Sequence, residues 1–229
     1  MATRLWLTRT QPGADRQAQE LRAAGYQVLV APVLEVAAIA AAAPAQAPDI
    51  VIFLSEHAVN CTPDLAFCDD ALVLAIGVRT RDVLASVGIA ARVPTEQRSE
   101  GLLQMPELAQ LQGFRVLVVA GQDGRGVLET ELAARGAQVA SYRCYRRVAV
   151  ADPAVEVADV DAIVVASGDG LQAAAGHWLT AGGNLDIPLL VPSARVAQLA
   201  RQQQFSRVLE CAGADSRAIL SVLQRLAVA

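Results

Sequence analysis

The chain has 229 residues, of which 54% are hydrophobic and 4% aromatic, and its formal net charge at pH 7 is −4. A mildly acidic chain without a basic tail argues against nucleic acid as the main partner. No apolar run reaches the roughly 18 to 20 residues that span a bilayer, and the short, charged N-terminus is unlike a secretory signal. We therefore expect a cytoplasmic protein that binds no membrane.

Short apolar runs rich in β-branched residues alternate with segments of helical spacing. We expect ten strands, at residues 4–9, 27–33, 49–55, 72–77, 92–95, 115–121, 138–145, 161–167, 188–193 and 207–213. Intervening segments such as ADRQAQELRAAG and RGVLETELAARG end on glycine, a common residue after the C-terminus of a helix. This alternation predicts parallel sheets covered by helices on both faces, and ten strands suit two five-stranded sheets.

The sequence also resembles itself. Residues 4–28 align without a gap on residues 115–139, a shift of 111 positions, and nine of the aligned pairs are identical. Nearly the same shift lays DIVIFLSEHAV on DAIVVASGDGL, which places Ser55 on Ser167. Self-similarity of this kind indicates a duplicated βα domain.

Two stretches interrupt the pattern at matching places of the repeat, AAIAAAAPAQAP and AVADPAVEV. Both are typical of linkers. We therefore predict a discontinuous domain of residues 1–35 and 158–229, an inserted domain of residues 45–145, and linkers at 36–44 and 146–157. The expected fold class is α/β, with two flavodoxin-like domains of parallel five-stranded sheets, related by duplication and joined by a two-stranded hinge.

Polar residues gather where predicted strands end, which is where ligands bind in open parallel sheets. These loops hold Arg9-Thr10, Ser55-Glu56-His57, Arg79-Thr80, Ser99, Gly121–Arg125, Ser167 and Ser193. Any single hydroxyl among them is more simply explained as the N-cap of a helix. Taken together, free amides at several helix N-termini facing one cleft would attract carboxylates or phosphates.

The residue types exclude several chemistries. The chain has no lysine, so Schiff-base chemistry and attachment of pyridoxal phosphate are impossible. Its four cysteines form no CxxC pair, and its two histidines, His57 and His177, lie far apart and in no triad order. The glycine spacing of GQDGRG is not that of a dinucleotide loop. Metal chemistry has little support, since no cluster of His, Asp and Glu appears, while His57 is open to either a structural or a site role.

The stretch YRCYRR, residues 142–147, holds two of the three tyrosines beside three arginines. Alternation along a strand would put Arg143, Tyr145 and Arg147 on one face, with Tyr142 on the other. Neighbouring guanidinium groups lower the cost of ionising a phenol, which suits proton transfer. An edge strand with packed tyrosines and solvated arginines explains the pattern equally well.

An ordered series of motifs resembles the uroporphyrinogen-III synthase family over essentially the whole chain. The series is LTR, LRAAGYQV before PVLEV, FLSEHAV, IGVRT, RSEGLL, GRGVLETELAARGAQV, Tyr145-Arg146-Arg147, SGDGL and GADSRAILSVL. The resemblance implies a lyase of haem biosynthesis that uses no metal or cofactor. Its substrate would be linear hydroxymethylbilane, with eight carboxylates, which is cyclised with loss of water and inversion of ring D.

By the same resemblance, Tyr145 takes the position of the tyrosine proposed to protonate the departing hydroxyl. The family's substrate-facing loops map to Arg9, Thr10, Ser55, Thr80, Ser99, Gly121, Arg125, Ser167 and Ser193, and His57 shares the loop of Ser55. The chain departs from the usual pattern at His57, Asp169 and Arg195, and a carboxylate at Asp169 would repel an anionic substrate that it faced.

This reading implies a monomer whose small-molecule substrate could be handed over by the preceding pathway enzyme. One alternative is a non-catalytic tetrapyrrole-binding or regulatory module of the same fold. A transferase with paired nucleotide-binding domains lacks support, because neither a diphosphate signature nor a ribose-binding carboxylate is present. A periplasmic-type binding protein shares the two-domain plan, but the chain shows no signal peptide.

Overall fold

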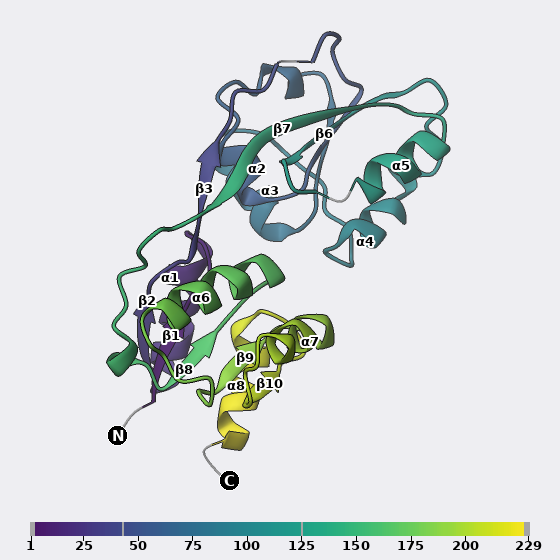
Figure 1. The fold of residues 1–229 in the computed structure, drawn as a ribbon. Helices are drawn as coiled ribbons and strands as arrows, with labels where there is room; N and C mark the ends of the chain where they lie inside the picture. The colour runs from purple at the N-terminus through teal and green to yellow at the C-terminus, as the bar shows by residue number, and fades with distance from the viewer. Residues whose placement is uncertain (1–2, 43, 125, 227–229) are drawn as a thin grey trace. The chain divides into compact units, whose positions relative to one another are not determined.

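The computed structural model describes residues 3–42, 44–124 and 126–226. Contacts within the chain divide it into two compact units, which we call unit 1 (residues 1–35 and 148–229) and unit 2 (residues 36–147). The chain passes between them twice, inside strand β3 (Leu34–Ala38) and inside strand β7 (Gln138–Ala149) (Figure 1). The stretches expected as linkers, 36–44 and 146–157, thus begin within strands.

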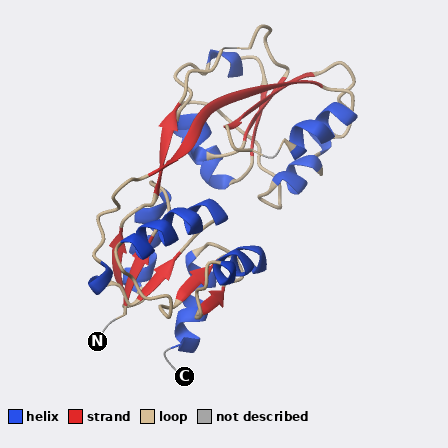
Figure 2. Ribbon diagram, in the orientation of Figure 1, coloured by secondary structure: helices blue, strands red, loops and turns tan. Residues whose placement is uncertain are grey.

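Unit 1 contains a five-stranded parallel sheet in the order β10–β9–β8–β1–β2. Numbered along the chain, the order is that of flavodoxin-like folds, 2-1-3-4-5. The strands are β1 (Arg4–Leu7), β2 (Gln27–Val30), β8 (Ala162–Val164), β9 (Leu189–Val191) and β10 (Val208–Glu210). The helices are α1 (Gly13–Ala23), α6 (Gly168–Thr180), α7 (Ala194–Gln202) and α8 (Ser216–Leu226), with a short 3-10 helix at Val157–Asp159 (Figure 2).

Both faces of this sheet are buried, as expected for a parallel sheet. Leu5 and Leu7 pack with residues of α1 and α8, whereas Trp6 between them packs with residues of α6 and α7. The indole N–H of Trp6 donates to the carbonyl of Ala31 at 2.8 Å, so this fully buried side chain leaves no polar atom unpaired. The apolar run of the first strand therefore supplies two cores at once.

Unit 2 contains a second five-stranded sheet, in the order β3–β7–β6–β4–β5. Its remaining strands are β4 (Ile50–Phe53), β5 (Leu72–Ala75) and β6 (Arg115–Gly121). Helices α2 (Glu56–Asn60) and α3 (Val78–Ser86) share a core with one face of the sheet, and α4 (Ser99–Leu103) and α5 (Val127–Ala134) share one with the other. Short 3-10 helices lie at Ala66–Cys68 and Pro106–Leu108.

Two expectations for this sheet are wrong. Residues 92–95 form no strand but only a single parallel bridge, between Leu74 and Arg92. Pro94 has no N–H to continue a ladder. The fifth strand is instead β3, and it is antiparallel to β7: the N–H of Ile39 donates to the carbonyl of Cys144 at 2.9 Å, and that of Val150 to the carbonyl of Val33 at 2.9 Å.

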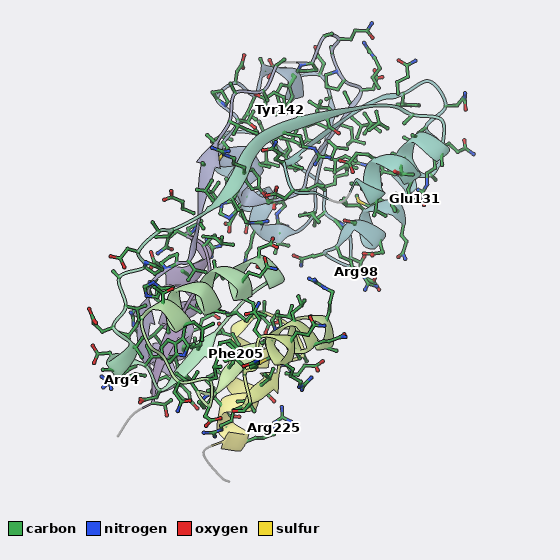
Figure 3. The ribbon with its side chains drawn as sticks, in the orientation of Figure 1. Arg4, Arg98, Glu131, Tyr142, Phe205 and Arg225 are labelled. Atoms are coloured by element: carbon green, nitrogen blue, oxygen red, sulfur yellow. The ribbon has the colours of Figure 1, made fainter. Side chains whose placement is uncertain are left out.

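The duplication recurs at the level of atoms. At the start of β6, the backbone N–H of Arg115 donates to the carboxylate of Asp49 at 2.8 Å, and its guanidinium does so at 2.9 Å. At the start of β1, the backbone N–H of Arg4 (labelled in Figure 3) donates to Asp161 at 2.8 Å. The same carboxylate–arginine contact thus ties the two central strands together in each unit, which confirms the predicted repeat.

Candidate functional site

In unit 2 the strand order reverses between β4 and β6, and a ligand site is expected beyond the carboxyl ends of these strands. Ser55 follows β4, and Gly121 ends β6. Tyr145 lies on the neighbouring strand β7, where it is only 5% exposed. Its phenol oxygen is 3.1 Å from the hydroxyl oxygen of Ser55, a hydrogen bond in which either group can be the donor.

A β-bulge creates the space for Tyr145. The register of β6 against β7 slips after Ala120, so that Gly121 lies opposite Tyr145. A Cβ atom on residue 121 would lie 2.7 Å from Cζ of Tyr145, so the ring can occupy this position only beside glycine. Tyr145 consequently packs in the same apolar cluster as Tyr142 and Cys144. The strict alternation expected for this strand is therefore wrong at Tyr145, because the bulge adds a residue.

Two further side chains confine the ring of Tyr145. The imidazole of His57 packs edge-on against it, with ring centroids 5.7 Å apart. The guanidinium carbon of Arg147 lies over the ring, 5.9 Å from its centroid, where the quadrupole of the ring attracts a cation. His57 and Arg147 thus both contact the tyrosine that the sequence singled out.

The other arginines of YRCYRR have different surroundings. Arg143 forms an ion pair with Glu129 of α5 and donates to the carbonyl of Gly121 at 3.2 Å. It therefore braces the start of the loop that borders Tyr145. Arg146 is exposed, as the edge-strand interpretation expects. Sequence reasoning missed the Arg143–Glu129 pair, because no spacing rule connects a strand residue with a helix residue 14 positions away.

Tyr142 (labelled in Figure 3) shows what burial does to a phenol on this strand. Its ring packs against Phe67, with centroids 5.8 Å apart, and it is 7% exposed. Desolvation raises the pKa of Tyr142 above its ordinary value. The expectation that nearby guanidinium groups would ease ionisation is thus wrong for this tyrosine.

Cys144 is a second residue whose role the sequence did not reveal. Its thiol is fully buried and lies 3.4 Å from the carbonyl of Ala58 and 3.7 Å from that of Ala120. Burial raises the pKa of Cys144, so the group stays a neutral thiol. It packs α2 against β6 directly beside Tyr145.

Three of the predicted site serines are helix N-caps. Ser55, Ser167 and Ser193 have extended backbones and precede α2, α6 and α7. Each hydroxyl accepts the N–H three residues on, at 3.0, 3.0 and 3.5 Å respectively. The cap interpretation is confirmed for these three, and it does not exclude a second contact, because a hydroxyl retains one donor and one further lone pair.

The remaining hydroxyls are not caps. Thr80 lies inside α3 and is 4% exposed. Ser99 is the first residue of α4, whose cap residue is Arg98. Thr10 precedes α1, and its carbonyl accepts the N–H of Ala14 at 3.1 Å.

In unit 1, Arg9 donates to the carbonyl of Ala214 at 3.3 Å, and its Nε lies 2.8 Å from where a Cβ of Gly13 would stand. Arg195, a departure from the family pattern, lies beside the first turn of α6, 3.5 Å from a Cβ position on Gly168. Asp169 is exposed in that turn, where a carboxylate favours the helix.

The structure therefore brings Ser55, His57, Gly121 and Tyr145 together within unit 2. Thr80 and Ser99 belong to the same unit, and Arg9, Thr10, Ser167 and Ser193 belong to unit 1. Arg125 lies outside the described residues.

Among the described residues, no group of three His, Cys, Asp or Glu side chains could hold a metal ion. No helix within residues 3–42, 44–124 and 126–226 is long and apolar enough to cross a membrane. A cavity of about 580 Å³ in unit 2 is lined by residues between Arg81 and Glu107, and Tyr145 is not part of its lining.

Comparisons with known proteins agree with the resemblance seen in the sequence. A family model described as uroporphyrinogen-III synthase HemD matches residues 15–221. The chain is 33% identical over 248 residues to the uroporphyrinogen-III synthase of Salmonella typhimurium, covering 95% of this chain and 98% of that protein. It is 34% identical over 198 residues to that of Escherichia coli, covering 77% and 78%.

Solved structures share the fold. The uroporphyrinogen-III synthetase of Helicobacter pylori matches with a TM-score of 0.66 at 14% identity, covering 99% of this chain and 100% of that one. A mutant uroporphyrinogen III synthase of Thermus thermophilus matches with a TM-score of 0.59 at 18% identity, and both chains are covered in full.

Proposed function

Because the chain belongs to the uroporphyrinogen-III synthase family, it is an enzyme of haem biosynthesis, and we propose that Tyr145 is the acid that starts its reaction. The family acts on a small tetrapyrrole. The proposed substrate is hydroxymethylbilane, a linear tetrapyrrole with a hydroxymethyl group at one end, and the product is the closed macrocycle with ring D inverted.

In the proposed reaction Tyr145 first donates a proton and later takes one back. Tyr145 donates its proton to the hydroxymethyl oxygen while the C–O bond breaks, and water leaves. The resulting azafulvene cation is attacked by the substituted carbon of ring D, and the spiro intermediate fragments and closes through the other α-carbon. Rearomatisation releases one proton, which returns to the phenolate. A single weak acid therefore suffices.

The contact between Tyr145 and Ser55 carries this proposal. It fixes a phenol oxygen 3.1 Å from the hydroxyl oxygen of Ser55, where β4 ends at the reversal of strand order. Gly121, His57 and Arg147 confine the ring around this position. Such restraint is required of a group that must meet one oxygen of a flexible substrate.

We further propose that the substrate carboxylates are bound by arginines and by hydroxyl and backbone groups at the ends of strands. The proposed residues are Arg9, Thr10, Ser55, His57, Thr80, Ser99, Gly121, Arg125, Ser167 and Ser193. Anions are favoured at helix N-termini, and α6, with its cap Ser167, offers such an end. A chain without lysine must use arginine for direct charge pairing.

The test is an assay with freshly made hydroxymethylbilane, in which the macrocycles are oxidised and their isomers separated. We expect isomer III well above the spontaneous isomer I, and a loss of turnover of about 10²-fold or more in Tyr145→Phe with little change in binding. Tyr142→Phe is the matched control, because it removes the same atom from the same strand, and the ring of Tyr142 packs against Phe67 and not against Ser55. Full turnover of Tyr145→Phe would remove it as the acid.

A non-catalytic tetrapyrrole-binding module would bind the ligand and yield isomer I alone. We also propose that the protein acts in the cytoplasm as a monomer and receives its substrate from the preceding enzyme. Its four free cysteines support a reducing compartment. Size-exclusion chromatography with light scattering tests the monomer, and a change in isomer ratio on adding the preceding enzyme tests the handover.

A further inference from the structure

The hydroxyl of Ser55 bonds to two groups at once. It accepts the N–H of Ala58 at 3.0 Å as the N-cap of α2, and it lies 3.1 Å from the phenol oxygen of Tyr145. A serine hydroxyl has one proton and two lone pairs, so two arrangements satisfy these contacts. In the first, Tyr145 donates to Ser55, and in the second, Ser55 donates to Tyr145.

The two arrangements differ in what the phenol can do next. If Tyr145 donates to Ser55, its only proton points at the serine and cannot reach a substrate. If Ser55 donates to Tyr145, the phenol proton is free to point outward, and the oxygen that gives it up already accepts a hydrogen bond. Only the second arrangement allows Tyr145 to give its proton directly to a substrate.

We propose that Ser55 is a positioning residue that donates to Tyr145 and thereby directs the phenol proton to the leaving hydroxyl. This inference rests on the proposed role of Tyr145. Donation runs in one line, from the N–H of Ala58 to Ser55, from Ser55 to Tyr145, and from Tyr145 to the substrate oxygen. Each bond of such a chain polarises the next, and the phenolate formed by proton transfer stays hydrogen-bonded until it is reprotonated.

The residues around Ser55 and Tyr145 restrict where the phenol of Tyr145 can lie. A Cβ on Gly121 would lie 3.1 Å from the phenol oxygen itself, so the hydroxyl lies against backbone on that side. The imidazole of His57, in α2, also packs against the ring of Tyr145, with ring centroids 5.7 Å apart. The phenol therefore cannot turn away from Ser55 without losing these contacts.

The experiment is a double-mutant cycle of Ser55→Ala and Tyr145→Phe, read by kcat, KM and thermal unfolding. A lost hydrogen bond to a developing charge predicts that Ser55→Ala lowers kcat by about ten- to a hundredfold, and this loss is separate from any rise in KM caused by removing its proposed substrate contact. In the Tyr145→Phe background the same substitution should change kcat by less than about twofold, since the partner is already gone. Ser55→Thr, which keeps the hydroxyl and can cap the helix, should restore most of the turnover.

A purely structural role makes a different prediction. Loss of the cap lowers the unfolding temperature equally in both backgrounds, so a structural effect on kcat would be equal as well. Ser167→Ala, which removes a cap of the same geometry in unit 1, calibrates the thermal effect of cap loss. Should Ser55→Ala fold poorly, Ser55→Gly replaces it, because glycine is tolerated at an N-cap at little expense in stability.

The outcomes separate the two proposals. If Tyr145→Phe loses turnover but Ser55→Ala loses the same factor in both backgrounds, or raises KM instead, the positioning role is overturned and the acid role stands. If Tyr145→Phe keeps full turnover, both fall together. Coupling of the two substitutions in kcat alone, with rescue by threonine, supports the inference.

Discussion

The sharpest prediction concerns Gly121, which faces Tyr145 across the bulge. In Gly121→Ala, the new Cβ would stand 2.7 Å from Cζ of Tyr145 and 3.1 Å from its oxygen. Carbon atoms in contact keep about 3.5 Å, so the ring must retreat by about 0.8 Å. A shift of that size along the line between the two oxygens would lengthen the present 3.1 Å to about 3.9 Å, beyond hydrogen-bond range of Ser55.

We expect two measurable effects of Gly121→Ala. Overpacking should lower the free energy of unfolding by ~1–3 kcal/mol. Because general-acid catalysis contributes about 10²–10⁴-fold and depends on hydrogen-bond reach, displacement of the acid should lower kcat at least about tenfold, whereas KM should change little. The assay is the separation of isomers III and I described above, with denaturation followed by circular dichroism.

The matched control is Gly176→Ala in α6. A Cβ at that position meets nothing within 4 Å, and Gly176 is exposed inside a helix. Alanine there should raise stability by roughly 0.5–1 kcal/mol and leave turnover unchanged. The reasoning is refuted if Gly121→Ala is destabilised as expected but retains full kcat, because the contact would then hold the fold without placing the acid.

Two further outcomes follow from the described contacts. A thiol reagent at pH 8 should label Cys61 first, because it is partly exposed whereas the other three cysteines are buried. Burial raises the pKa of Cys68 to about 12 and that of Cys211 to about 11, and it also raises the pKa of Cys144. A fast labelling phase that survives Cys61→Ser would contradict this. The guanidinium of Arg115 lowers the pKa of Asp49, so this carboxylate stabilises the fold above its ordinary pKa, and the contribution is lost as pH falls through the lowered value. The unfolding temperature of Asp49→Asn should therefore lie below that of the native chain at pH 6, with a gap that closes toward pH 2.5; a constant gap would exclude the linkage.

Much of the fold follows from the sequence, because its pattern is local. The glycines that end the predicted helical segments, Gly25 and Gly136, have φ values of +93° and +90°, which other residues rarely adopt. They are related by the same shift of 111 positions that related the strands. Residues 92–95 look like a strand in composition, and they occupy the place of β10 in the repeat, but Pro94 has no N–H to continue the ladder beyond the bridge between Arg92 and Leu74.

The candidate site was less predictable, for a physical reason. Tyr145 and the loop residues could be named from the sequence, yet the contacts that give them a role depend on register. A one-residue slip between β6 and β7 turns Tyr145 toward Ser55. A bulge of this kind has no strong sequence signature apart from the glycine, and the family resemblance maps Gly121 to a substrate-facing loop without indicating its contact with Tyr145.

Comparison of the two units explains why the proposed acid occurs once in a duplicated protein. Ser55 and Ser167 occupy equivalent positions and cap equivalent helices with the same geometry. The shift of 111 positions, however, places Thr10 on Gly121 and Leu34 on Tyr145. In this alignment unit 1 has neither the glycine nor the tyrosine of the unit 2 pair. Both members of the pair, Gly121 and Tyr145, are thus replaced in unit 1, and the proposed catalytic role of unit 2 depends on that pair rather than on the N-cap serine that both units share.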